Sequence, residues 1–152
     1  MSRELKTLRP PTEEVNLFWE VANVLNLRST LALYLLTKRG GRKIMYIGKA
    51  GSQTIRSRLL CASKERLSKK RVECRVLVAG LQTSRRVTKK LVDDVERLLI
   101  FLVQPEWNRV GKRSCRLHHQ ELIVNCDGKW PLRQSRYSCL DEFPLELHYR
   151  SE

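Results

Sequence analysis

Residues 31–50 read LALYLLTKRGGRKIMYIGKA, and this stretch decides the fold. It holds two short apolar runs, 31–36 and 44–48, of the length and composition that favour β-strands. The polar connection between them contains a Gly-Gly pair, which suits a tight turn. The stretch therefore predicts a β-hairpin.

Side chains alternate between the two faces of a strand, so the hairpin also predicts which residues share a face. On the second strand, Ile44 and Tyr46 are expected on one face, and Met45 and Ile47 on the other. Tyr34 lies on the first strand and can face Tyr46 across the hairpin. Two phenol groups are thus expected side by side.

Two helices and a third strand are predicted after the hairpin. Residues 53–70 approximate a basic helix with one apolar stripe, and residues 71–80 alternate as a strand does. A second, longer helix is expected to open at Thr83 or Ser84 and to end before Pro105. Its expected buried positions are Val87, Leu91, Val95, Leu98 and Leu102.

The two ends of the chain give further elements. Residues 1–11 are a polar arm, and Thr12 is a suitable N-cap for a helix that ends near Asn26. Apolar residues repeat there at helical spacing: Val15, Phe18, Trp19, Ala22 and Leu25. In the tail, Asp127-Gly128 stands between two apolar runs and predicts a second hairpin.

The predicted fold is therefore α+β, with a three-stranded antiparallel sheet flanked by helices, an N-terminal helix and a C-terminal hairpin extension. A length of 152 residues suits a single domain, 1–152. Within it we expect a core at 30–108, an N-terminal arm and helix at 1–29, and an extension at 109–152.

The net charge of +14 is concentrated in one part of the chain. Residues 38–90 hold 17 of the 30 Lys and Arg but only 2 of the 16 Asp and Glu. Such a concentration favours a polyanionic partner, here DNA. No apolar run approaches the ~20 residues that span a bilayer, and the N-terminus lacks an apolar signal core. We expect a soluble, intracellular (cytoplasmic) protein with no membrane partner.

Five cysteines form an odd set without any CxxC pair. Cys61 and Cys74 lie in apolar periodic segments, as buried thiols do. A zinc site in the tail is an alternative, although its spacings match no common ligand pattern. Its ligands would come from Cys115, His118, His119, Cys126 and Cys139.

Glu96 is the chemically informative residue of the second helix. It borders the apolar stripe of that helix, where a carboxylate is unfavourable unless it is paired or binds a metal. A surface glutamate paired with Arg97 or Lys89 is the alternative. Spacing alone favours the surface glutamate.

The chain resembles the GIY-YIG nucleases over about residues 30–108. Tyr46-Ile47-Gly48 matches the second triplet, and Ala32-Leu33-Tyr34 stands at the first with its tyrosine kept. The remaining matches, in order along the chain, are Lys49-Ala50, Ile55-Arg56-Ser57-Arg58-Leu59, Glu96-Arg97-Leu98-Leu99-Ile100 and Pro105-Glu106-Trp107-Asn108. The chain departs from the pattern at Ala62, where many members carry His or Tyr. A slightly long gap before the helix leaves Arg56 as a substitute for Arg58.

The resemblance implies a GIY-YIG-type fold and a metal-dependent DNA endonuclease of restriction or phage type. Its catalytic set would be Tyr34, Tyr46, Lys49, Arg58, Glu96 and Asn108, with Glu96 holding Mg²⁺ or Mn²⁺. Tyr34 is the first choice for the general base, and Tyr46 for a supporting hydrogen bond. Contacts to the DNA backbone are expected from Lys43, Arg56, Arg66, Lys69, Lys70 and Arg71.

Two other functions remain open at this point. One is a non-catalytic nucleic-acid-binding protein that keeps the fold and the charge. The other is a zinc-stabilised adaptor that uses the cysteines and histidines of the tail. Because one active site cuts one strand, a homodimer or higher homo-oligomer is also considered, with the predicted N-terminal helix carrying Phe18 and Trp19 as its assembly surface.

Overall fold

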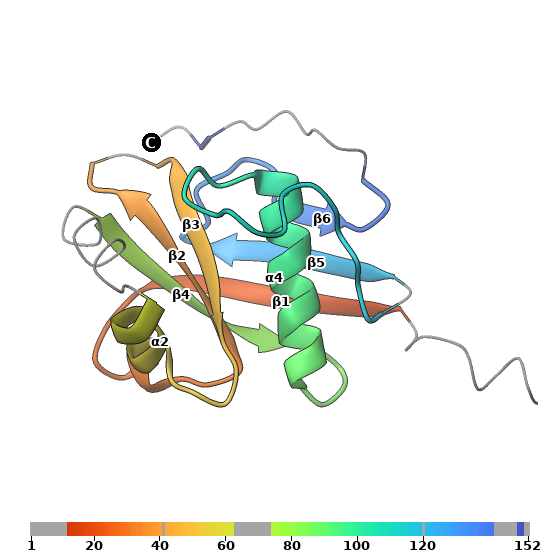
Figure 1. The fold of residues 1–152 in the computed structure, drawn as a ribbon, viewed down its shortest axis with the longest axis horizontal. Coiled ribbons are helices and arrows are strands. Elements are labelled where there is room, and N and C mark those ends of the chain that lie inside the picture. Colours follow the sequence, from red (N-terminus) through yellow and green to blue (C-terminus); the bar gives the residue numbers. More distant parts are fainter. Residues whose placement is uncertain (1–11, 41, 63–73, 120, 142–148, 151–152) are drawn as a thin grey trace, which may run out of the picture.

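The computed structural model describes residues 12–40, 42–62, 74–119, 121–141 and 149–150 (Figure 1). Its strands are β1 (Glu13–Val21), β2 (Ala32–Lys38), β3 (Ile44–Ala50), β4 (Cys74–Gln82), β5 (Leu122–Gly128) and β6 (Arg136–Ser138). Its helices are α2 (Ile55–Ala62), α4 (Lys89–Val103) and the short 3₁₀ helix η1 (Asn26–Arg28).

The described strands form one sheet in the order β3-β2-β4-β1-β5-β6. The β1–β5 pair is parallel and the other pairs are antiparallel, so the sheet is mixed. The sheet curls into half a barrel, and α4 crosses its strands (Figure 1). The α+β class is confirmed, whereas the expectation of a three-stranded sheet is wrong, because β1, β5 and β6 extend it to six.

The predicted N-terminal helix is also wrong, because residues 13–21 form strand β1 in the interior of the sheet. Its burial alternates strictly: Val15, Leu17 and Trp19 are buried, while Phe18 is 57% exposed. Pairing with β4 on one side and β5 on the other provides hydrogen-bond partners for the backbone on both edges. This pairing favours a strand, whose side chains alternate every second residue, over a helix. The assembly helix proposed to carry Phe18 and Trp19 is therefore absent from the described residues.

The predicted hairpin of β2 and β3 is confirmed, with one change of face. The register shifts between Leu36 and Thr37, which leaves Met45 as an extra residue in β3. As a result, Ile44 and Ile47 pack into the same core cluster, whereas Tyr46 packs on the opposite face. The expectation that Ile44 shares a face with Tyr46 is thus wrong.

The sheet has hydrophobic packing on both faces around β2. One cluster lies between α4 and the sheet and includes Leu33, Leu35 and Trp19. The second lies on the other face, where Ile55 and Leu59 of α2 cover Tyr34. Tyr34 thus faces away from Leu33, as the alternation predicts.

The remaining elements follow the predicted order with shifted boundaries. Helix α4 starts after Thr88, whose side chain accepts a hydrogen bond from the Leu91 amide, rather than after Thr83 or Ser84. It ends at Gln104, which takes the left-handed conformation at φ 56°. The predicted strand at 71–80 is observed as β4, and part of it, like part of the helix predicted at 53–70, lies outside the described residues.

The C-terminal region completes the sheet. β5 and β6 pair in antiparallel fashion, but the hairpin predicted with its turn at Asp127-Gly128 is wrong. Those two residues are still within β5 and pair with Phe18 and Trp19 of β1. None of the helices in the described part of the chain is long and apolar enough to cross a membrane.

Candidate active site

A pocket of about 620 Å³ opens beside the edge strand β3, between α2, α4 and the loop that follows α4. Its polar lining comes from Tyr46, Lys49, Arg58, Asp93, Glu96, Arg97, Asn108, Arg109, Ser114 and Arg116. Tyr46, Lys49, Arg58, Glu96 and Asn108 are five of the six expected catalytic residues. The sixth, Tyr34, is 1% exposed and lies directly behind Tyr46.

The two tyrosine rings stack obliquely, with centroids 6.0 Å apart and planes inclined by 34°. Gly48 lies opposite Tyr34 in the register of β2 and β3. A Cβ atom at Gly48 would come within 2.3 Å of the Tyr34 ring. Any side chain at position 48 would overlap the Tyr34 ring, so the glycine is what allows the phenol to pack here.

The phenols are held in their neutral forms in this structure. Burial raises the pKa of Tyr34 far above its usual range, and the neighbouring Tyr46 adds to the effect. Burial also raises the pKa of Tyr46, with help from the Glu96 charge, while a hydrogen bond from Tyr34 and the Arg58 charge lower it. Of the two phenols, only Tyr46 accepts a hydrogen bond from the other, and this bond and the Arg58 charge partly offset the effect of burial on its pKa.

Glu96 is one of two carboxylates that line the pocket from α4, and it is mostly buried. Burial raises its pKa to about 7, the nearby Asp93 adds to this, and Lys49 and Arg58 oppose it. The Lys49 ammonium nitrogen lies 3.7 Å from Glu96 Oε1 but is in direct contact with Asp93 Oδ1. Asp93, not Glu96, is therefore the principal partner of Lys49.

Asp93 is a residue that the sequence did not single out. Besides Lys49 it contacts Arg97 at 3.3 Å and the His118 ring at 3.2 Å. Burial by itself raises the pKa of Asp93, but the hydrogen bond and charge of Lys49, together with the charge of Arg97, outweigh burial and lower the pKa below its usual value. Asp93 remains ionised, and its oxygens are committed to cations.

Arg58 and Arg56 occupy different environments. Arg58 lines the pocket, and its Nε donates a hydrogen bond to the Lys49 carbonyl at 3.3 Å. Arg56 is exposed on α2 and does not line the pocket. Of these two arginines, Arg58 is the one placed to reach a group bound beside Glu96.

Asn108 holds the free edge of β3 instead of projecting freely into the pocket. Its side-chain oxygen accepts from the Ile47 amide and its nitrogen donates to the Ile47 carbonyl, both at 2.9 Å. The Trp107 amide adds a hydrogen bond to the Met45 carbonyl at 2.8 Å. Asn108 thus positions the strand that carries Tyr46 and Lys49.

The other expected DNA contacts are only partly within the described residues. Lys43 is exposed and forms an ion pair with Glu106 at 3.3 Å. Arg66, Lys69, Lys70 and Arg71 lie outside the described residues.

Asp94 is a second residue that the sequence did not reveal. It is 0% exposed and accepts hydrogen bonds from the amides of His118 and His119, each at 2.8 Å, and contacts the His119 ring at 2.6 Å. The histidine pair is thus packed against α4, with His119 buried. Asp94 lies at a position of α4 whose neighbours Leu91, Val95 and Leu98 are buried. A carboxylate on that apolar stripe needs hydrogen-bond donors, and this could have indicated its role in holding the histidine loop.

Among the described residues, one group of three side chains could together bind a metal ion: Asp93, Asp94 and His118. Their potential ligand atoms lie within 4.8 Å of one another. These groups already bind one another or nearby cations. No cysteine belongs to such a group, so the described residues give no support to a zinc site in the tail.

Comparison of the chain with protein-family models, with curated proteins and with solved structures gives no match.

Proposed function

We propose that this protein is a metal-dependent DNA endonuclease that hydrolyses phosphodiester bonds by chemistry of the GIY-YIG type. The observation that carries the proposal is the convergence of Tyr46, Lys49, Arg58 and Glu96 on one pocket from β3, α2 and α4. These groups supply a phenol, two cations and a carboxylate, the set that hydrolysis of a phosphodiester requires.

Glu96 suits a divalent cation in its surroundings. Its carboxylate is mostly buried, and its nearest cation, Lys49, is held closer to Asp93. Mg²⁺ binds through one or two carboxylates and keeps several waters, for which the pocket of about 620 Å³ has room. When bound at Glu96, Mg²⁺ or Mn²⁺ would stabilise negative charge on the phosphate oxygens.

The residues of the chain would then divide the remaining tasks. Tyr46 reaches the pocket and, as its tyrosinate, would accept a proton from the attacking water, with the Tyr34 hydroxyl donating to its oxygen. The Arg58 charge and a metal ion bound at Glu96 would favour that ionised form. This exchanges the roles first expected of the two tyrosines, because water cannot reach a phenol that is 1% exposed. Arg58 would bind the phosphoryl oxygens, and Lys49 would be kept beside them by Asp93.

The proposal is tested by nicking of supercoiled plasmid with and without Mg²⁺. The parent protein is expected to nick only with Mg²⁺, and Glu96→Gln to lose nicking while keeping its fold and its affinity for DNA. Glu20→Gln, which changes an exposed carboxylate on β1, is the matched control and is expected to behave like the parent.

Two outcomes would contradict the proposal. Equal nicking by the parent and by Glu96→Gln would remove Glu96 from the metal site. DNA binding without nicking by the parent would instead favour a nucleic-acid-binding protein. Tyr46→Phe is expected to lower the nicking rate by about 10²-fold or more, and Tyr34→Phe by less, because only the first removes the proton acceptor.

A further inference from the structure

The loop after α4 presents a row of cations that has no assigned role. Residues 109–116, here called the basic loop, read RVGKRSCR. Arg109, Arg113 and Arg116 are exposed, and none of them has a carboxylate partner among the described residues. Three guanidinium groups are therefore free to bind an anion from solvent.

The basic loop is held in place along its length. The Gln104 side-chain amide donates to the Lys112 carbonyl at 2.7 Å, and Lys112 Nζ donates to the Pro105 carbonyl at 2.8 Å. Arg97 donates to the Arg116 carbonyl at 2.9 Å, and Asp94 accepts from the amides of His118 and His119 just beyond the loop. Because the partners in and beside the loop are backbone carbonyls and amides, these contacts order the loop without neutralising its three exposed arginines.

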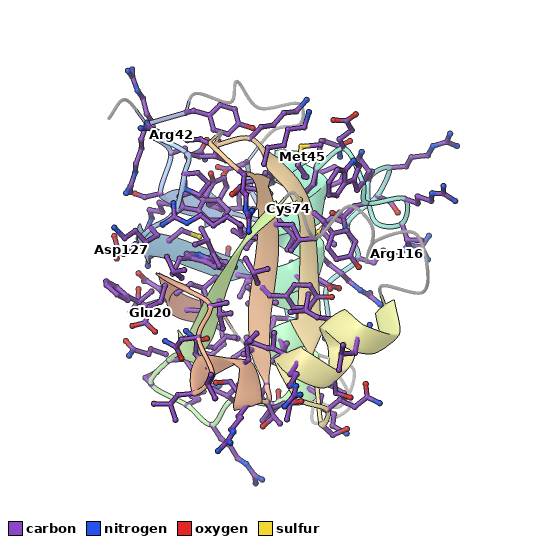
Figure 2. The ribbon with its side chains drawn as sticks, turned by 90° about the vertical axis from the view of Figure 1, so that its left-hand side faces the viewer. Glu20, Arg42, Met45, Cys74, Arg116 and Asp127 are labelled. Carbon is purple, nitrogen blue, oxygen red and sulfur yellow. The ribbon has the colours of Figure 1, made fainter. Side chains whose placement is uncertain are left out.

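The basic loop borders the pocket described above. Arg109 and Arg116 line the same pocket as Arg58 and Glu96. Figure 2 shows Arg116 on the side of the molecule where α2 lies, whereas Glu20 and Asp127 lie on the opposite side. Arg109 and Arg116 therefore add positive charge to the rim of the pocket.

We propose that the basic loop is a phosphate-binding wall, which grips the backbone of duplex DNA on the side of the pocket opposite α2. This inference rests on the proposed function, because it places the cleaved phosphate beside Glu96 and the flanking phosphates against Arg109, Arg113 and Arg116. Guanidinium groups bind phosphate oxygens through paired hydrogen bonds, and a preordered loop loses little entropy on binding. These contacts position the DNA and do not read its sequence.

The test measures the salt dependence of DNA binding by fluorescence anisotropy, in EDTA so that no cleavage occurs. The loop variant replaces Arg109, Arg113 and Arg116 with Ala. The control variant removes three exposed arginines that do not line the pocket: Arg39, Arg86 and Arg133. Denaturation curves of both variants are compared with the parent to verify folding.

Each phosphate contact adds about 0.9 to the slope of log affinity against log salt concentration. The loop variant is expected to lower that slope by about 2 to 3 and to weaken binding by about tenfold or more at moderate salt. The control variant is expected to change the slope by less than about 1. Equal slopes in the two variants, or a slope in the loop variant equal to that of the parent, would overturn the inference.

The same proteins separate this inference from the proposed function. If the parent binds DNA with a loop-dependent slope but never nicks plasmid with Mg²⁺, the nuclease proposal fails and the phosphate-binding wall stands. If the parent nicks plasmid and the loop variant nicks it with unchanged KM for DNA, the wall fails and the nuclease proposal stands. Absence of DNA binding by the parent contradicts both.

Discussion

Gly48→Ala tests the packing on which the candidate site depends. The added Cβ would lie 2.3 Å from Cζ and 2.5 Å from the hydroxyl oxygen of Tyr34, so the ring must move by roughly 1 Å to regain ordinary contact. The Tyr34 ring is enclosed by α2 and the sheet and has little room to move. We expect the free energy of unfolding to fall by about 1–3 kcal/mol, measured by urea denaturation.

A matched substitution and a double-mutant cycle show whether the ring is the cause. Gly80 lies in the same sheet, and a Cβ there meets no atom within 4 Å. Gly80→Ala is therefore expected to be neutral or to stabilise by up to about 1 kcal/mol. In a Tyr34→Leu background the clashing ring atoms are gone, so Gly48→Ala should become nearly neutral. An equal loss in both backgrounds would refute the reasoning.

The other predictions concern Glu96, Asp94 and β1. The pKa of Glu96 rises from 4.5 to about 7 on folding, so the folded protein keeps a proton that the unfolded chain releases, and stability falls as pH rises from about 4.5 to 7. In thermal melts at pH 8, Glu96→Gln should exceed the parent by about 2 kcal/mol, and Mg²⁺ should stabilise the parent only. Asp94→Ala leaves buried amides without an acceptor and should lower the free energy of unfolding in urea by about 3 kcal/mol, against less than about 0.5 kcal/mol for the exposed Asp127→Ala. By the same measurement, Trp19→Ala should lower it by about 3–5 kcal/mol and Phe18→Ala by less than about 0.5 kcal/mol; equal losses would contradict the strand assignment of β1.

Much of the middle of the fold could be predicted because its signals are local. The Gly-Gly turn between two apolar runs and the long apolar stripe of α4 each need only a few neighbouring residues. The N-terminal strand could not be predicted from such local signals. Val15 and Trp19 fit both a helical period and an alternating one, and the choice is made by strands more than 55 residues away.

The candidate site shows the same division between local and distant information. The gathering of Tyr46, Lys49 and Glu96 at one pocket agrees with the order of motifs along the chain. The binding of Lys49 by Asp93, and of the histidine loop by Asp94, involves irregular segments whose positions no periodicity encodes. The Met45 bulge is likewise a property of pairing between strands and has no signal in β3 alone.

The parallel pairing of β1 with β5 has a consequence for how the chain is made. Asn16 and Asn125 lie side by side although 109 residues separate them, so this pairing closes a very long loop and is expected to form late. During synthesis, β4 can cover one edge of β1 well before β5 emerges from the ribosome. A nascent chain that has not reached residue 122 thus exposes an open β1 edge with Val15, Leu17 and Trp19 beside it, a template for aggregation until the last strands arrive.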